Sequence, residues 1–338
     1  MIVIPYIFFI VLIFIITYIS LIYFIKYAKK RGIVSEPNKR TLHQGLIPRG
    51  GGIVFSIIYI IALVFVKNIL GLDNDIFYSL IIGGSLISIY GFIDDIVNIK
   101  RYKKFIFLSF FSLMPFIFFG LGPLSNIENI PAIISYPVTW FLILWFLNAY
   151  NFIDGIDGLA ISVSTFIFIL LFVILTSVSS GLSVGLLSVL LASCCSAFLI
   201  FNWPPAKIFM GDSGSLFLGY SILVFLFKTN HIQVMSIWTW LIMLAFVVGD
   251  TTTTSFLRLF LVRRWYGSHR SNAYQNLARI LDSHFKVLLG IMIYHIAWLL
   301  PLTIMSIKYP SYEMILFFPA YIPVIIFSLI YGPMYSSK

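Results

Sequence analysis

Charged residues are scarce in this chain of 338 residues. Lysine, arginine, aspartate and glutamate make up only 10% of it, whereas 60% of the residues are hydrophobic. Average soluble proteins carry about 25% charged residues. The mean hydropathy is +1.02. So few charged side chains could not cover the surface of a soluble protein of this length, and we therefore expect an integral membrane protein.

Cysteine is scarce as well. The two cysteines, Cys194 and Cys195, are adjacent within an apolar run. Neighbouring cysteines rarely form an unstrained disulfide, and the sequence contains neither a CxxC motif nor a Cys/His spacing typical of a metal site. We therefore expect both cysteines to be small packing residues.

Long apolar runs predict an all-α, polytopic membrane protein with a single domain over residues 1–338. The first run is too long for the core of a signal peptide and lacks a basic start, so we expect it to be retained. The run 214–228 is the weakest, because it is short and follows the polar segment GDSGS. The eleven predicted transmembrane helices are 2–25, 52–70, 76–92, 104–121, 132–147, 160–179, 182–201, 214–228, 234–257, 285–306 and 312–332.

Basic residues predict the orientation of these helices. Alternation of the spans places all five long loops on one side, together with all but three of the 22 lysines and arginines. Because cationic loops stay in the cytosol, we expect the N-terminus outside and the C-terminus inside. The net charge of +10 then reflects topology and affinity for anionic lipid, and implies no nucleic-acid partner. The five loops are 26–51, 93–103, 148–159, 202–213 and 258–284.

Two adjacent aspartates, Asp94 and Asp95, end a predicted span in the segment GFIDDIVNIK. Neighbouring carboxylates repel each other unless a cation or a proton lies between them. The pair therefore predicts a Mg²⁺ site or an acid–base pair. The alternative is a solvated helix end, which the basic residues that follow would favour; these are Lys100, Arg101, Lys103 and Lys104.

The segment NAYNFIDGIDGLA places Asn148, Asn151, Asp154 and Asp157 at a strict spacing of three residues. On an α-helix such steps drift by about 60°, so the four side chains would line a broad stripe. The glycines that follow each aspartate would let a ligand approach the backbone. A turn between spans explains each residue type separately but not the regular spacing, so we favour a ligand-binding role.

A third polar segment, FNWPPAKIFMGDSGSLFLGY, places Asp212 directly before a predicted span. The small residues around this acid leave room for a phosphate or a metal ion near a helix N-terminus. In the alternative, Asp212 or Ser213 is the N-cap of the helix, and Asn202 and Lys207 are incidental. We favour the ligand site.

Three further features leave their alternatives open. The segment RRWYGSHRSNAYQ suits a diphosphate through its arginines and histidine, but it is equally an ordinary cationic loop. The segment SEPNKRTLHQGLIPRGGG is either a phosphate-binding loop or a linker. Asp250 lies within a predicted span, where it either faces a cleft or pairs with a neighbour as a structural contact.

Taken together, these segments resemble the polyprenyl-phosphate N-acetylhexosamine-1-phosphate transferases of glycosyltransferase family 4. Five segments match in order over residues 35–275. The resemblance implies that a polyprenyl phosphate, in bacteria undecaprenyl phosphate, attacks the β-phosphate of a UDP-amino sugar and releases UMP. It implies Mg²⁺, or Mn²⁺ in its place, as the cofactor, and a multi-pass protein of the bacterial inner membrane; a homodimer is compatible with it. The matching segments are EPNKRTLHQGLIPRGGG, GFIDD, NAYNFIDGIDGLA, NWPPAKIFMGDSGSLFLG and SHRSNAYQ.

The resemblance also implies roles for individual residues. Asp212 would be the principal metal ligand, and Asp94 and Asp95 would orient the metal or accept a proton from the lipid phosphate. Asp154 and Asp157 would complete the catalytic group by binding the nucleotide and supporting the metal site. The expected substrate-binding residues are Lys39, Arg40, His43, Asn148, Asn151, Asn202, Lys207, His269, Arg270 and Gln275.

The identity of the sugar follows less directly. The fifth loop lacks the histidine triplet of the peptidoglycan-precursor branch and resembles the branch that starts O-antigen chains of lipopolysaccharide from UDP-N-acetyl-6-deoxyhexoses. Glu36, Leu108 and Asn272 depart from that pattern, and no role is carried over to Asn272. The alternative is UDP-GlcNAc for another envelope polymer. A secondary transporter is disfavoured, because no internal repeat is present and, apart from Asp250, no acid lies deep within a predicted span.

Overall fold

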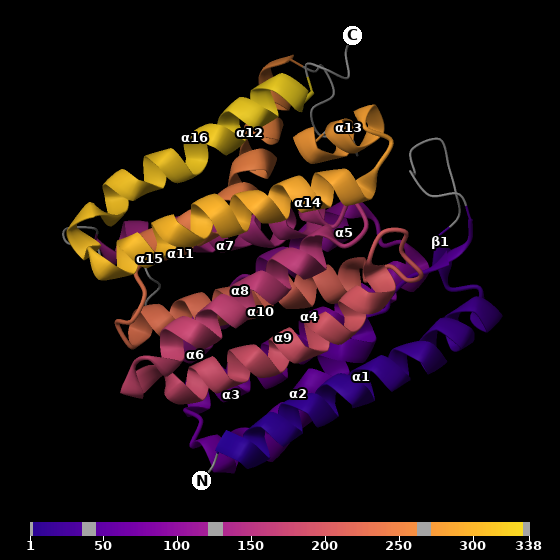
Figure 1. The fold of residues 1–338 in the computed structure, drawn as a ribbon, viewed down its shortest axis with the longest axis horizontal. Helices are drawn as coiled ribbons and strands as arrows, with labels where there is room; N and C mark the ends of the chain where they lie inside the picture. Colours follow the sequence, from indigo (N-terminus) through magenta and orange to yellow (C-terminus); the bar gives the residue numbers. More distant parts are fainter. Residues whose placement is uncertain (1–2, 36–44, 121–130, 262–271, 334–338) are drawn as a thin grey trace.

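The computed structural model describes residues 3–35, 45–120, 131–261 and 272–333. Nearly all of these residues are helical, and the helices run side by side along the long axis of the molecule (Figure 1). The only strands in the described part are β1 (Val34–Ser35) and β2 (Ile47–Pro48), which pair antiparallel. The predicted all-α, polytopic membrane fold is therefore confirmed.

Several consecutive helices join into single spans, namely α3 with η1 and α4, α5 with α6, and α14 with η4 and α15. The first half of the chain contains α1 (Val3–Arg31), α2 (Gly52–Leu70), α3 (Asn74–Tyr78), η1 (Ser79–Gly83), α4 (Gly84–Val97), α5 (Arg101–Phe111), α6 (Met114–Phe119), α7 (Ala132–Ile153) and α8 (Leu159–Thr176). The second half contains η3 (Ser179–Gly181), α9 (Leu182–Asn202), α10 (Gly211–His231), α11 (Ile237–Met243), α12 (Ala245–Leu261), α13 (Ala273–Ile280), α14 (His284–Tyr294), η4 (His295–Leu299), α15 (Leu300–Lys308), η5 (Pro310–Tyr312) and α16 (Glu313–Tyr331).

The number of apolar spans differs slightly from the prediction of eleven. Among the described residues, nine helices are long and apolar enough to cross a membrane, and α11 with α12, which bend by 77° at their junction, make a tenth. The remaining predicted span is α10, which holds glycines, serines, Asp212 and Lys228. This helix can be polar because it faces other helices instead of lipid, and it is buried from Ser213 to Thr229.

Helix α10 forms the centre of the bundle and packs against α2, α4 and α7. The outer helices α1 and α16 lie on opposite sides of it (Figure 1) and keep large apolar side chains exposed, such as Phe8 and Phe318. In a membrane these side chains would face lipid. Both cysteines are free and fully buried, so the prediction that they are packing residues is confirmed.

The central helices approach one another through glycines. A Cβ atom on Gly91 of α4 would lie 2.4 Å from the backbone oxygen of Asp212, and one on Gly52 of α2 would lie 2.1 Å from the backbone nitrogen of Gly214. No side chain fits at such distances, so glycine is required at both positions. The close packing fixes the start of α10 against α2 and α4.

Three predicted loops are shorter than expected, because their polar residues belong to helix ends. Helix α4 continues to Val97 and stops where Asn98 adopts a left-handed conformation with φ 53°. Helix α7 continues to Ile153, so Asn148 and Asn151 are helical. Asp212 lies in the first turn of α10. A polar side chain does not end a helix; a break in the backbone hydrogen bonding does.

Asp250 is a structural contact. Its side chain is fully buried and accepts hydrogen bonds from the Ser328 hydroxyl at 2.8 Å and from the backbone N–H of Ala273 at 3.2 Å. It therefore links α12 to the start of α13 and to α16. Of the two alternatives left open for this acid, the structural one describes its contacts.

Candidate active site

A cavity of about 310 Å³ opens at one end of the bundle, where the described parts of all five predicted loops meet. Segments more than 200 residues apart in the sequence contribute to its walls. We call this end of the bundle the site end. The polar lining residues are Ser35, Arg49, Asp95, Asn151, Asp154, Asp157, Asn202, Asp212, Gln275 and His284.

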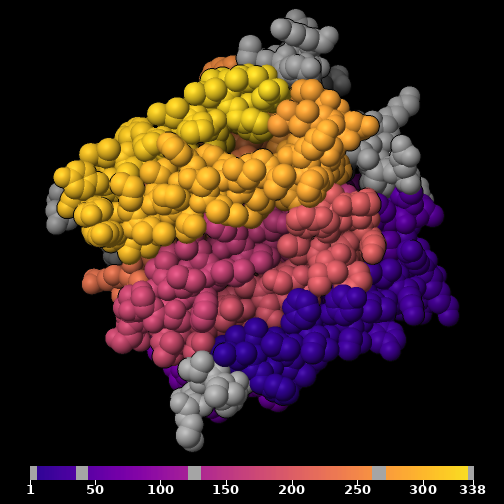
Figure 2. Space-filling model, viewed as in Figure 1, coloured from indigo at the N-terminus to yellow at the C-terminus, as the bar shows by residue number. Residues whose placement is uncertain are grey.

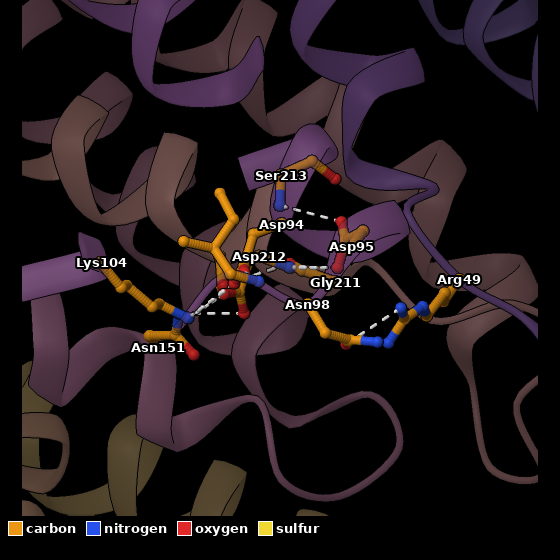
Figure 3. A network of polar contacts seen from close by, with 11 residues as sticks. Arg49, Asp94, Asp95, Asn98, Lys104, Asn151, Gly211, Asp212 and Ser213 are labelled. Carbon is orange, nitrogen blue, oxygen red and sulfur yellow. Dashed lines mark hydrogen bonds and ion pairs between the residues drawn. The ribbon is translucent and has the colours of Figure 1, made fainter. Parts of the chain in front are cut away.

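Beside this cavity, a lysine ammonium lies between two carboxylates (Figure 3). Lys104 Nζ lies 3.1 Å from Asp94 Oδ2 and also contacts Asp212 Oδ2. Asn151 donates from Nδ2 to the other carboxylate oxygen of Asp212 at 3.1 Å. These residues come from α5, α4, α10 and α7, so four helices together build one cation-holding group.

Asp95 faces a different partner from its neighbour Asp94. Its carboxylate accepts the backbone N–H of Asp212 at 3.0 Å and that of Ser213 at 3.2 Å, and the residue is only 6% exposed. Asp95 thereby satisfies two of the N–H groups that the first turn of α10 leaves unbonded. The alternative in which Asp212 or Ser213 is the N-cap of this helix is wrong, because the N-cap is Met210 and both residues lie within the first turn.

The turn after α7 is held by Asp157. Its Oδ2 accepts the backbone N–H of Ala206 at 3.0 Å and lies 3.2 Å from His284 Nδ1. The same ring nitrogen lies 3.3 Å from the backbone nitrogen of Asp157, so the tautomer of His284 decides which of the two contacts forms. Asp154, at the end of α7, lines the cavity. The turn is thus tied to the fourth loop and to the start of α14.

Two of the predicted substrate-binding residues line the cavity in different ways. Asn202 braces the wall, because its Oδ1 accepts the Gly158 N–H at 3.0 Å and its Nδ2 donates to the Ile208 carbonyl at 2.7 Å. Gln275 is buried, and its Oε1 has no hydrogen-bond partner in the described part of the chain. Of the two, Gln275 retains an acceptor that a ligand could use.

Other predicted residues lie elsewhere. Asn148 donates to the Leu144 carbonyl of its own helix at 2.8 Å and does not line the cavity. Lys207 is exposed and borders a separate hollow beside α1. The predicted phosphate-binding residues of the first and fifth loops lie outside the described residues; they are Lys39, Arg40, His43, His269 and Arg270.

Sequence reasoning did not assign a site role to Arg49, Lys104 or His284. Arg49 lines the cavity and donates to Asn98 Oδ1 at 3.2 Å. Lys104 is the first residue of a predicted span, and His284 directly precedes another. The last two positions are typical of ordinary helix ends, so the sequence carried no signal for Lys104 or His284. Arg49 lies in the segment that the sequence left open between a phosphate-binding loop and a linker.

The donor atoms at the site suit a divalent metal ion that substrate phosphates would also ligate. The described residues contain no group of three or more His, Cys, Asp and Glu side chains in metal-binding geometry. Asp94 and Asp212 nevertheless converge on one cation, the Lys104 ammonium. Mg²⁺ is typically bound by one or two carboxylates, with substrate phosphates and water as further ligands. The two carboxylates present are therefore as many as a Mg²⁺ ion typically takes from a protein when substrate phosphates complete its coordination.

Comparison with known proteins identifies the family. The model of the family described as "Glycosyl transferase family 4" matches residues 77–230. A probable undecaprenyl-phosphate N-acetylglucosaminyl 1-phosphate transferase of Bacillus subtilis is 30% identical over 83% of this chain and 79% of its own length. A phospho-N-acetylmuramoyl-pentapeptide-transferase of Caldicellulosiruptor bescii is 30% identical over 59% of this chain and 66% of its own. A putative UDP-N-acetylglucosamine–dolichyl-phosphate N-acetylglucosaminephosphotransferase of Sulfolobus acidocaldarius is 29% identical over 61% and 66%. The chain belongs to glycosyl transferase family 4.

Proposed function

We propose that this protein transfers a sugar-1-phosphate from a UDP-activated N-acetylhexosamine to undecaprenyl phosphate in the bacterial inner membrane. Two of the relatives are named for transfer of N-acetylglucosamine phosphate to undecaprenyl or dolichyl phosphate, and the third is named for transfer of phospho-N-acetylmuramoyl-pentapeptide. The observation that carries the proposal is the pair Asp94 and Asp212. Their carboxylates hold the Lys104 ammonium beside a polar cavity at the end of a transmembrane bundle. A soluble nucleotide and a lipid phosphate would meet at such a place.

The proposed reaction forms one phosphorus–oxygen bond and breaks another. An oxygen of the polyprenyl phosphate attacks the β-phosphorus of the UDP-sugar. The bond between that phosphorus and the oxygen that bridges to the α-phosphate breaks, and UMP leaves with the electron pair. A polyprenyl-diphospho-sugar remains in the membrane, and no oxidant or reductant is required.

The residues of this chain bind and orient the phosphates. We propose that Asp94 and Asp212 hold Mg²⁺, or Mn²⁺, which neutralises phosphate charge when bound. Asn151 orients Asp212 through its amide, and Asp95 holds the first turn of α10 in position. Lys104 then faces phosphate oxygens instead of the two carboxylates, and the opposing charges assist transfer by electrostatic stabilisation.

Other parts of the cavity would receive the donor nucleotide and its diphosphate. Arg49, whose guanidinium suits phosphate oxygens, lies at the cavity wall beside Asn98. Asp154 and Gln275 present acceptors for the nucleotide or the sugar. The positive loops favour a cytosolic position for this site, where UDP-sugars are available.

For the sugar, two candidates have separate support. The segment SHRSNAYQ favours a UDP-N-acetyl-6-deoxyhexose and a role at the start of O-antigen synthesis. The Bacillus relative, named for N-acetylglucosaminyl transfer, favours UDP-GlcNAc and another envelope polymer. The first is our proposal and the second is the alternative, and the chemistry is the same in both.

Purified protein would be assayed with undecaprenyl phosphate, Mg²⁺ and a panel of UDP-sugars, and UMP release would be measured. We expect Mg²⁺-dependent UMP release that requires the lipid phosphate, with one sugar preferred. A protein that releases no UMP with any UDP-sugar, under conditions where a related transferase is active, would contradict the proposal. Preference for UDP-GlcNAc over its 6-deoxy analogues would select the alternative.

A further inference from the structure

A second hollow, of about 240 Å³, lies between α14 and α16 on the outside of the bundle (Figure 2). Lys286, Gly290 and Tyr294 of α14 line one wall, and Pro323 and Phe327 of α16 line the other. Every remaining lining residue is apolar. The hollow is therefore an apolar groove with a single charged residue, Lys286, at the site end of the bundle.

The shape of the groove follows from how the two helices pack. Helix α16 packs mainly on α11, α12 and α13, not on the first turns of α14. Gly290 adds no side chain there, and a Cβ atom on it would meet nothing within 4 Å. Farther along, the Tyr294 hydroxyl donates to the Ala320 carbonyl and joins α14 to α16. The groove thus extends from Lys286 to Tyr294, eight residues or about 12 Å of helix, and ends there.

The polarity of the groove matches that of a lipid. Lys286 is exposed, and its ammonium makes no ion pair within the described residues. Exposed apolar residues, Leu289 and Ile293, flank the groove. Basic positions between transmembrane helices at the membrane surface attract anionic headgroups. We propose that this groove binds one acyl chain of an anionic phospholipid, whose headgroup phosphate lies on Lys286.

Other lipids fit less well. Both an acyl chain and a polyprenyl chain extend past a groove that closes at Tyr294, but the much longer polyprenyl chain would leave most of its length outside it. A zwitterionic phospholipid would bring a second cation close to Lys286. The groove also adjoins the candidate active site, because Lys286 is two residues from His284, which contacts Asp157. A bound lipid would hold the start of α14 in place. An effect of the lipid on transfer, through the position of His284, rests on the proposed function, but the binding of the lipid itself does not.

The test is photolabelling of the full chain in lipid nanodiscs, with a phosphatidylglycerol that carries a photoreactive acyl chain. We expect labelled peptides from α14 and α16 around Gly290 and Phe327. Gly290→Phe, which fills the groove, should abolish this labelling, and the smaller Gly290→Leu should reduce it. Lys286→Gln should reduce it about fivefold, the contribution of one lysine near a membrane surface. Thermal melting of each variant would verify that it is folded.

Matched control variants test whether a loss of labelling depends on where the substitution lies and not only on the size or charge that it changes. Ile61→Phe places the same phenylalanine on an exposed position of α2, which does not line the groove, and Lys103→Gln removes another exposed lysine; both should label like the wild type. The proposal is overturned if folded Gly290→Phe labels normally. It is also overturned if unlabelled phosphatidylcholine competes as well as phosphatidylglycerol, or if undecaprenyl phosphate displaces the probe and phosphatidylglycerol does not.

Discussion

Helix α10 carries an ion cluster at each of its ends, and both clusters place a lysine ammonium between two aspartates. At its start, Asp212 shares the ammonium of Lys104 with Asp94. At its other end, Lys228 binds Asp73, which is the N-cap of α3, and Asp75 in the first turn of α3. Because α3, η1 and α4 form one span, both clusters fasten α10 to this span, one at each of its ends. The cluster at the site end also includes α5, which supplies Lys104.

The surroundings distinguish the two clusters. At the far end, Lys228 is 3% exposed and lies 2.5 Å from Asp73 Oδ2 and 2.8 Å from Asp75 Oδ2. At the site end, Lys104 is 26% exposed and Asp212 lines the cavity. A buried lysine between carboxylates fixes a helix end, because breaking the pair leaves a buried charge. An accessible one can exchange with a ligand. Charge composition alone does not reveal which function a cluster has.

The largest difference between the clusters should appear when one aspartate of each is neutralised. We expect Asp212→Asn to lower transfer about 10³-fold, because an amide cannot stabilise the cation and the phosphate charges. Asp73→Asn, in the far cluster, should leave turnover unchanged. UMP release from a UDP-sugar and undecaprenyl phosphate measures both. Equal losses of turnover in the two folded variants would show that the two clusters do not differ in function.

Replacing the lysine of each cluster should reveal a second difference in function between them. Lys104→Met should lower transfer about 10²-fold and yet raise the affinity for Mn²⁺ without substrate about tenfold. An ammonium that competes for the same carboxylates within about 4 Å contributes energies of this order. Mn²⁺ binding is measured by electron paramagnetic resonance.

Lys228→Met is the matched substitution at the far end. It should lower the free energy of unfolding by about 2 kcal/mol, because bonds to a charged group contribute about that much, and should leave Mn²⁺ affinity as in the wild type. Thermal or denaturant unfolding in detergent gives the first value. A variant at position 104 that binds Mn²⁺ more weakly than wild type would show that Lys104 does not occupy the cation position.

Much of this arrangement follows from the sequence, but the pairing of residues does not. Hydropathy predicted the spans, and the basic loops predicted that five segments gather at one end, because the membrane imposes both. Asp94 and Asp95 looked equivalent, yet successive residues on a helix point about 100° apart, so one meets Lys104 and the other α10. Likewise, only helix geometry selects Lys104 over Lys103. Such partners depend on packing between distant helices, which a single sequence does not show.

A smaller effect is expected for Asp95 at the site end, and it distinguishes a positioning role from metal binding. Asp95→Asn leaves only one acceptor for the two N–H groups of Asp212 and Ser213, and a lost helix cap costs about 1 kcal/mol. We expect turnover to fall about tenfold, because Asp212 is less well positioned, while Mn²⁺ affinity stays nearly unchanged. Asp94→Asn should instead weaken Mn²⁺ binding. If the two variants lose metal affinity equally, Asp95 is a ligand and its contacts with α10 are secondary.

The smallest effect is expected at His284, which contacts Asp157 from the start of α14. In His284→Gln the carboxylate keeps its hydrogen bond from Ala206, so the loss is one interaction of about 1 kcal/mol. This predicts a kcat/KM for the UDP-sugar about fivefold lower, with the KM for the lipid phosphate unchanged. His231→Gln is the matched control, because this exposed histidine ends α10 at the opposite end. If both substitutions lower kcat/KM alike, the effect does not arise at the cavity. If His284→Gln changes only the lipid KM, then Asp157 and the turn after α7 belong to the acceptor side of the site, and the nucleotide must bind nearer to Arg49.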